Sequence, residues 1–237
     1  MLGLPPQFAV TTASRPLRLA IMTSRPPLPM LRADQMTVAH WLAFLAARGH
    51  RVELFALHDA PVEPGATAWL MEHCAAVHWF HRPRWRSIVG AAAAWLQGRP
   101  LQVGYFDDTA QARALRGAED RFDLVYAYYI RSAEAARHLR RAPTVLAMQL
   151  SQTLNIERML ASFSTRRERL LYTLELPRVR SYEARVWSDF TQTVLIGPAD
   201  LAAVERACGQ SGQRRIDNAV LIPHGVDLSR PPPAAEL

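Results

Sequence analysis

Lysine is absent from this sequence of 237 residues, so all 28 basic residues are arginines. The absence excludes every chemistry that needs a lysine side chain: the phosphate-binding lysine of a P-loop, a Schiff base and a serine–lysine dyad. With 21 acidic residues, the formal net charge is +7. Because alanine is abundant as well, we attribute the arginine content to a GC-rich genome, and we predict no nucleic-acid partner.

Cysteine is scarce too, since Cys74 and Cys208 are the only two. Two cysteines so far apart favour a reduced, cytoplasmic protein over a disulfide framework. The longest apolar stretch, Ile88 to Leu96, is far shorter than the ~20 residues that a membrane-spanning helix needs. The sequence therefore predicts a cytoplasmic protein, with peripheral contact at the inner face of the membrane as the open alternative.

Short apolar runs alternate with helical patterns along the chain. Runs typical of buried strands cover residues 17–23, 50–57, 75–80, 123–128, 143–148, 191–196 and 218–222. Helices are predicted over 34–48, 84–97, 107–116, 131–141, 152–187 and from 198 onward, with Pro177 kinking or splitting the longest. This alternation predicts an α/β fold: a Rossmann-like, doubly wound, mostly parallel sheet with helices on both faces.

One domain is expected over residues 16–230. Residues 1–15 contain Pro5 and Pro6 and are expected to be a disordered segment. Residues 231–237 begin with three prolines and are expected to be a linker or a cut end.

Ligands of doubly wound sheets bind at the carboxyl ends of the strands, and the common signatures are missing there. No Gly-x-Gly-x-x-Gly follows the first strand, and there is no Gly-x-Ser-x-Gly nucleophile motif, so we predict neither a dinucleotide cofactor nor a serine hydrolase. His73, Cys74, His78 and His81 lie close together but match no set of metal ligands, and no metal site is predicted.

Three charged or aromatic stretches have more than one interpretation. Asp107 and Asp108 could be a carboxylate pair for a metal, but we favour the start of a helix. The arginines between 166 and 185 could meet phosphates, but we favour a solvated helix face partly paired with Glu168, Glu175 and Glu183. The aromatic and aliphatic stretch 85–95, flanked by arginines, fits an interfacial membrane contact and internal packing equally well.

Four segments follow one another in an order and spacing typical of one protein family. They are AIMTSRPPLP at 20–29, LAARGHRV at 45–52, RFDLVY at 121–126 and IPHGVD at 222–227. Together they resemble the N-terminal domain of family-4 glycosyltransferases, which have the GT-B fold. The segment GRPLQVGYF at 98–106 is similar to a subgroup that builds bacterial exopolysaccharide.

The resemblance implies one of two Rossmann-like domains that face each other across a cleft. In such enzymes the N-terminal domain mostly holds the acceptor, and the C-terminal domain binds the nucleotide-sugar donor. It therefore implies sugar transfer to a saccharide or lipid-linked acceptor in polysaccharide biosynthesis, with no cofactor and no metal. Because the donor domain is absent from this sequence, the chain alone is predicted to be inactive. The alternative is a noncatalytic, truncated or degenerate domain that binds a partner or a glycan.

The resemblance also implies substrate-binding positions at the carboxyl edge of the sheet. The predicted residues are Arg25, Ala33, Asp34, Tyr128, Arg131, Gln149, Ser151 and His224. Arg25 and Arg131 are expected to attract a phosphorylated acceptor or the donor diphosphate.

Several of these positions depart from the family pattern. Ala33 stands where the family often has glycine, Thr37 replaces a basic residue, and His224 replaces asparagine. Gln149 stands in the place of a histidine that contacts the transferred sugar. Glutamine can hydrogen-bond a hydroxyl group but cannot carry a proton near neutral pH. No catalytic residue is therefore assigned.

Overall fold

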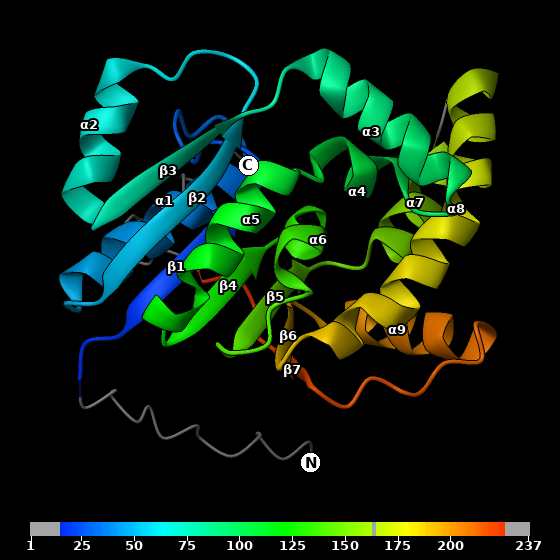
Figure 1. Ribbon diagram of the computed structural model, residues 1–237. Coiled ribbons are helices and arrows are strands. Elements are labelled where there is room, and N and C mark those ends of the chain that lie inside the picture. The colour runs from blue at the N-terminus through cyan, green and yellow to red at the C-terminus, as the bar shows by residue number, and fades with distance from the viewer. Residues whose placement is uncertain (1–14, 163–164, 226–237) are drawn as a thin grey trace, which may run out of the picture.

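A seven-stranded sheet forms the centre of the computed structural model, which describes residues 15–162 and 165–225 (Figure 1). The strands are β1 (Arg18–Thr23), β2 (Arg51–His58), β3 (Ala76–His81), β4 (Leu124–Tyr128), β5 (Thr144–Gln149), β6 (Gln192–Leu195) and β7 (Ala219–Leu221). Their order is β3-β2-β1-β4-β5-β6-β7, and every neighbouring pair is parallel. The predicted Rossmann-like fold is confirmed. The predictions for residues 1–14 and 231–237 lie outside the described residues.

Helices connect the strands. They are α1 (Ala33–Ala47), α2 (Pro64–His73), α3 (Arg84–Leu96), α4 (Leu101–Phe106), α5 (Thr109–Ala118), α6 (Ala133–Ala136), α7 (Gln152–Ser162), α8 (Arg166–Val186) and α9 (Pro198–Gln210), with 3-10 turns η1 (Glu119–Arg121), η2 (Ile130–Ser132) and η3 (Trp187–Asp189). The sequence did not indicate α2 or α4, whose short patterns lack a helical period. Asp108 caps α5 as expected, accepting the N–H groups of Ala110 and Gln111 at 3.0 Å.

Two helix predictions differ from the structure. The helix expected over 131–141 is only η2 and the single turn α6, because Glu119 accepts the N–H groups of residues 140, 141 and 142. The Glu119 carboxylate thus accepts backbone N–H groups that would otherwise donate to carbonyl oxygens of a helix. The long helical region divides before α8 and not at Pro177, which lies inside α8. Thr165 starts the new helix by accepting the N–H of Glu168 at 3.3 Å.

The alternation of side chains along β1 shows how two cores are built from one sheet. Ala20 and Met22 face the layer formed by α5, α6, α8 and α9. Leu19 and Ile21 point the other way, toward α1 and α2. Such burial on both faces is why the strands read as nearly continuous apolar runs.

Part of the second face has no helix over it among the described residues. There a groove of about 350 Å³ runs beside α1 across β4 to β7. Trp41 of α1 forms one wall and stacks on Tyr126 of β4, with 5.8 Å between the ring centroids. The rest of the lining is mostly aliphatic and also includes His50, Tyr128 and Gln192. Helix α1 therefore does not fill the space over this face of β4 to β7.

Helices α3 and α4 pack with their backbones in close approach. Gly90 of α3 lies directly against Gly104 of α4: a Cβ added at Gly90 would be 2.5 Å from the Gly104 carbonyl oxygen. Such a distance is inside van der Waals contact, so only glycine fits. Small residues on the inner side of α3 therefore fix how this helix sits beside the sheet edge.

We expect Gly90→Ala to lower the free energy of unfolding by about 3 kcal/mol, because the new methyl group forces the two helices apart. Denaturant unfolding measures the loss. The matched control is Gly117→Ala in α5, where an added Cβ meets nothing within 4 Å. That change is expected to raise stability by about 0.5 kcal/mol through better helix propensity. Equal effects from both variants would contradict the packing argument.

Candidate functional site

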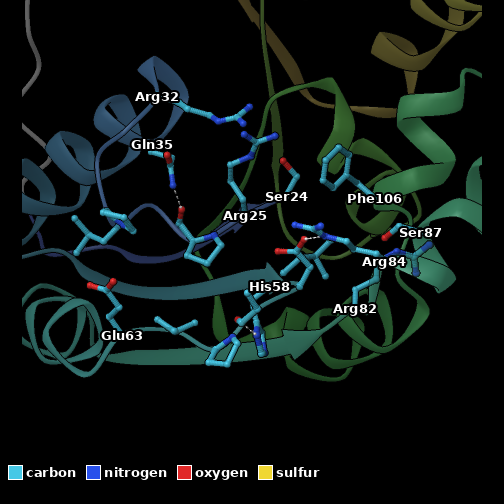
Figure 2. Close-up of a pocket in the computed structure, with 18 of the residues that line it drawn as sticks. Ser24, Arg25, Arg32, Gln35, His58, Glu63, Arg82, Arg84, Ser87 and Phe106 are labelled. Carbon is cyan, nitrogen blue, oxygen red and sulfur yellow. Dashed lines mark hydrogen bonds and ion pairs between the residues drawn. The ribbon is translucent and has the colours of Figure 1, made fainter.

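A cavity of about 470 Å³ opens where β1, β2 and β3 end (Figure 2). The loop after β1, the loop after β2 and the start of α3 form its walls. The lining contains basic and aromatic side chains and two carboxylates: Arg25, Arg32, Arg82, Arg84, His58, Tyr105, Phe106, Asp59 and Glu63. This is the edge at which doubly wound sheets bind their ligands.

Asp34 in the first turn of α1 joins two arginines from different loops. Its carboxylate accepts a hydrogen bond from Arg131 Nη2 at 2.8 Å and lies 3.5 Å from Arg25 Nε. Both guanidinium groups also lie over the ring of Phe106, at 5.9 Å for Arg25 and 5.0 Å for Arg131. The structure thus brings together three of the predicted residues, Arg25, Asp34 and Arg131.

The positive charge in this cluster exceeds the negative charge. Burial, followed by the nearby Arg131 charge, lowers the pKa of Arg25 below its ordinary value, although Asp34 opposes the shift. Arg32 adds a further positive charge close by, and Figure 2 shows its guanidinium turned toward Arg25. No carboxylate of the described residues pairs with Arg32. Within the cluster, Arg25, Arg32 and Arg131 outnumber the single carboxylate of Asp34, which favours an anionic ligand at this side of the cavity. Two further carboxylates, Asp59 and Glu63, line the cavity as well.

The opposite side of the cavity is held by arginines that are already paired. Arg82 is 9% exposed and donates to the carbonyl oxygens of Tyr105 and Gly104, at 2.9 and 3.2 Å, and to Asp108 at 3.3 Å. Arg84 Nε donates to Asp59 at 3.0 Å. These bonds tie the ends of β2 and β3 to α4 and α5, so this wall is a rigid frame.

Left-handed backbone marks the ends of β4 and β5. Tyr129 has φ 71° and Gln149 has φ 69°, and within the described chain they are the only non-glycine residues with positive φ. Such conformations cost energy and gather at sites where the backbone must turn in a particular way. Gln152 donates to the Tyr129 hydroxyl at 2.8 Å, so the two strand ends are bonded to each other.

Ser151 is fully buried, and its hydroxyl is already engaged. It donates to Glu183 of α8 at 3.0 Å, while the N–H groups of Gln152 and Thr153 donate to the same carboxylate. Burial raises the pKa of Glu183, although the hydrogen bonds from Thr153, Gln152 and Ser151 oppose it. Ser151 therefore serves to fix the start of α7, and a ligand could reach its hydroxyl only if these bonds parted.

Of the remaining predicted residues, Tyr128 joins Arg25 and Asp34, and the others are dispersed around the edge. Tyr128 is 6% exposed and lies beside Asp34, while Gln149 is 7% exposed. Ala33 is exposed at the first position of α1, and His224 is exposed after β7. The closing motif is described only as far as Gly225. The glutamates expected to pair with the α8 arginines bond elsewhere, Glu175 with the N–H of Leu101 and Glu183 as described above.

Arg32, Arg82, Arg84 and Phe106 line the cavity but were not predicted. A usable signal was present for two of them, because Arg82 and Arg84 directly follow the run that forms β3. Arg32 lies in a proline-rich loop whose course no periodicity indicates. Within the described ranges, no three histidine, cysteine or carboxylate side chains gather as metal ligands.

No protein-family profile matches the chain, and no curated protein sequence matches it. Among solved structures, Anabaena Alr3699/HepE in complex with UDP and glucose is 15% identical and superposes with a TM-score of 0.52, covering 90% of this chain and 46% of HepE. The glycotransferase of kitacinnamycin is 16% identical with a TM-score of 0.42, covering 93% of this chain and 56% of that chain.

The chain thus spans about half the length of HepE and has the fold of that half. This similarity confirms the predicted fold, and the assignment to the family-4 glycosyltransferases stays a prediction. No described helix is long and apolar enough to cross a membrane.

Proposed function

We propose that this chain is the acceptor-side domain of a sugar transferase. It forms one wall of a cleft in which a sugar passes from a nucleotide-sugar to a saccharide or lipid-linked acceptor. The nucleotide-sugar binds mainly to a second domain that this sequence does not include. Polysaccharide biosynthesis, suggested by the segment 98–106, is the process in which we place it.

One observation carries the proposal: the arginine-lined cavity lies at the carboxyl edge of a fold that is similar to half of HepE, a protein crystallised with UDP and glucose. A cavity of about 470 Å³ has room for a sugar with a phosphate group. Phe106 and Tyr105 offer aromatic surfaces for the faces of a sugar ring, while Arg25 and Arg32 offer donors for an anionic group.

Titration calorimetry of the 237-residue chain with glucose 1-phosphate, glucose and UDP-glucose tests the proposal. We expect glucose 1-phosphate to bind more tightly than glucose, because only the phosphate meets the uncompensated arginines. The double variant Arg25→Gln/Arg32→Gln is expected to weaken that binding by about tenfold or more. A tenfold loss corresponds to the loss of one charge-assisted contact, and the variant removes two arginines. No transfer or hydrolysis of UDP-glucose is expected from the chain alone.

The matched control is Arg113→Gln/Arg116→Gln, which removes two exposed arginines of α5 that do not line the cavity. It should leave glucose 1-phosphate binding unchanged. If both double variants weaken binding equally, the effect is one of general charge and the cavity is not the site. Turnover of UDP-glucose by the chain alone would contradict the division of roles between two domains.

A noncatalytic glycan-binding domain is the second candidate. Gln149 favours this candidate, because it stands where the resemblance implies a histidine and its side chain cannot carry a proton. The Gln149 residue is also only 7% exposed. The two candidates differ in what a donor domain adds. Mixing the chain with the donor half of a related transferase should yield sugar transfer for the first candidate and none for the second.

A further inference from the structure

Helix α3 presents its largest apolar side chains to solvent. Trp85 and Ile88 are each 62% exposed, Val89 is 60% exposed and Leu96 is 81% exposed. Their spacing of three, four and seven residues places them on one side of the helix. The opposite side carries Ser87, Gly90 and Ala94 and packs on α4, so the helix is turned with its apolar side outward.

The first half of α8 is unusual in the same way. Every buried residue of this helix lies at Glu175 or later, so residues 166–174 contribute nothing to the core. They include Leu170, Leu171 and Leu174, which are 62%, 48% and 47% exposed. Figure 1 shows this end of α8 extending beyond the body of the domain.

Contacts hold the two helices together. The guanidinium of Arg178 in α8 lies 4.1 Å from the ring centroid of Trp95 in α3. Its Nε also donates to the Trp95 carbonyl at 3.4 Å. Because the end of α3 contacts the middle of α8 in this way, the two sets of exposed apolar side chains lie on neighbouring helices.

Uncompensated positive charge accompanies these side chains. Arg166, Arg167 and Arg169 are exposed, and no carboxylate of the described residues pairs with any of the three. In α3, Arg86 lies 5.4 Å from the ring centroid of Trp85. Apolar side chains bordered by tryptophan and arginine are the composition of surfaces that enter the headgroup region of an anionic bilayer.

We propose that α3 and the first half of α8 form a docking surface for an anionic lipid membrane. The outward side of α3 enters the interface between headgroups and acyl chains, and the arginines of α8 meet lipid phosphates. The outward side chains of the stretch 85–95 thereby serve as a membrane contact, while its inner side packs on α4. This surface is independent of sugar transfer. Resting on the proposed function, its position also places the cavity next to the bilayer, because Arg84 and Ser87 of α3 line the cavity.

Flotation of the full chain with vesicles tests this surface. We compare vesicles of phosphatidylglycerol and phosphatidylcholine in equal parts with vesicles of phosphatidylcholine alone. The chain is expected to float with the anionic vesicles and to be released by high salt. Trp85→Ser/Ile88→Ser/Val89→Ser should weaken the binding at least tenfold, and Arg166→Gln/Arg167→Gln/Arg169→Gln should weaken it by about fivefold for each arginine removed.

Two controls separate this result from general effects of apolarity and charge. Met71→Ser removes an apolar side chain of α2 that is 55% exposed, and Arg113→Gln/Arg116→Gln removes two exposed charges of α5. Both should float like the unchanged chain, and unfolding midpoints verify that every variant is folded.

Three outcomes would overturn the proposal: no flotation with anionic vesicles, equal flotation with both kinds of vesicle, or surface variants that float like the controls. Sedimentation of the chain without lipid adds a fourth. A dimer that Trp85→Ser/Ile88→Ser/Val89→Ser abolishes would assign the surface to a second copy of the chain instead. Because the vesicles contain no sugar, failure here leaves the cavity experiment unaffected.

Discussion

Glu183→Ala is expected to lower the free energy of unfolding by about 4 kcal/mol, since it leaves three buried donors without an acceptor at roughly 1–3 kcal/mol for each unpaired group. The donors are the Ser151 hydroxyl and the N–H groups of Gln152 and Thr153. Glu183 is 0% exposed, so water cannot replace the lost oxygen atoms. Urea unfolding at neutral pH measures the loss.

Glu183→Gln is the control for the role of charge. Glutamine keeps one of the two oxygen atoms, so it should lose about one hydrogen bond, roughly 1–2 kcal/mol. The variant should also change the pH dependence. The pKa of Glu183 is raised on folding, so its contribution to stability is complete below the unfolded pKa and declines as pH rises through the folded one. The glutamine side chain of the variant cannot ionise, and that decline should vanish. An alanine variant as stable as the glutamine variant would show that the three donors find other acceptors.

Arg82→Ala is the second change with a large expected effect, about 3–5 kcal/mol, because it breaks a buried ion pair by removing one partner. Asp108 is 6% exposed and would lose the only cation that pairs with it among the described residues. The carbonyl oxygens of Tyr105 and Gly104 would lose a donor as well. Since Arg82 frames one wall of the cavity, glucose 1-phosphate binding should weaken together with stability.

The matched control is Arg84→Ala on the same wall. Arg84 also pairs with a carboxylate, Asp59, but its side chain is 78% exposed. Exposed pairs contribute little, so the loss should be far smaller than that of Arg82→Ala. A double variant, Arg82→Met/Asp108→Asn, should recover part of the lost stability because it leaves no unpaired buried charge. Equal losses for Arg82→Ala and Arg84→Ala would contradict this account of burial.

The sheet could be predicted well from the sequence because each strand is a short apolar run that ends at a loop residue. Ala20 and Met22 are buried on one face and Leu19 and Ile21 on the other, which gives β1 its continuous apolar pattern. The helices were harder to predict where tertiary bonds replace helical ones. Glu119 is distant in sequence from residues 140–142, and nothing in the local pattern indicates that it accepts their N–H groups.

The candidate site was predictable only where a strand end carries the residue. Arg25 and Arg131 follow β1 and β4, and the position of Asp34 near the start of α1 brings it to the same edge. Arg32 could not be assigned, because the direction of its side chain depends on the course of a loop with three prolines. For Ser151, the position after β5 could be predicted from the sequence. Its buried hydrogen bond to Glu183 could not, because Glu183 belongs to α8.

The near contact between Gly90 and Gly104 governs how α3 responds to its surroundings. An amphipathic helix that packs loosely can rotate about its own axis and bury its apolar side when no partner covers that side. Helix α3 cannot rotate in this way, because turning any other residue inward would bring a side chain into collision with the backbone of α4. The outward apolar side of α3, from Trp85 to Leu96, is therefore exposed in the chain by itself and does not form only when a partner binds.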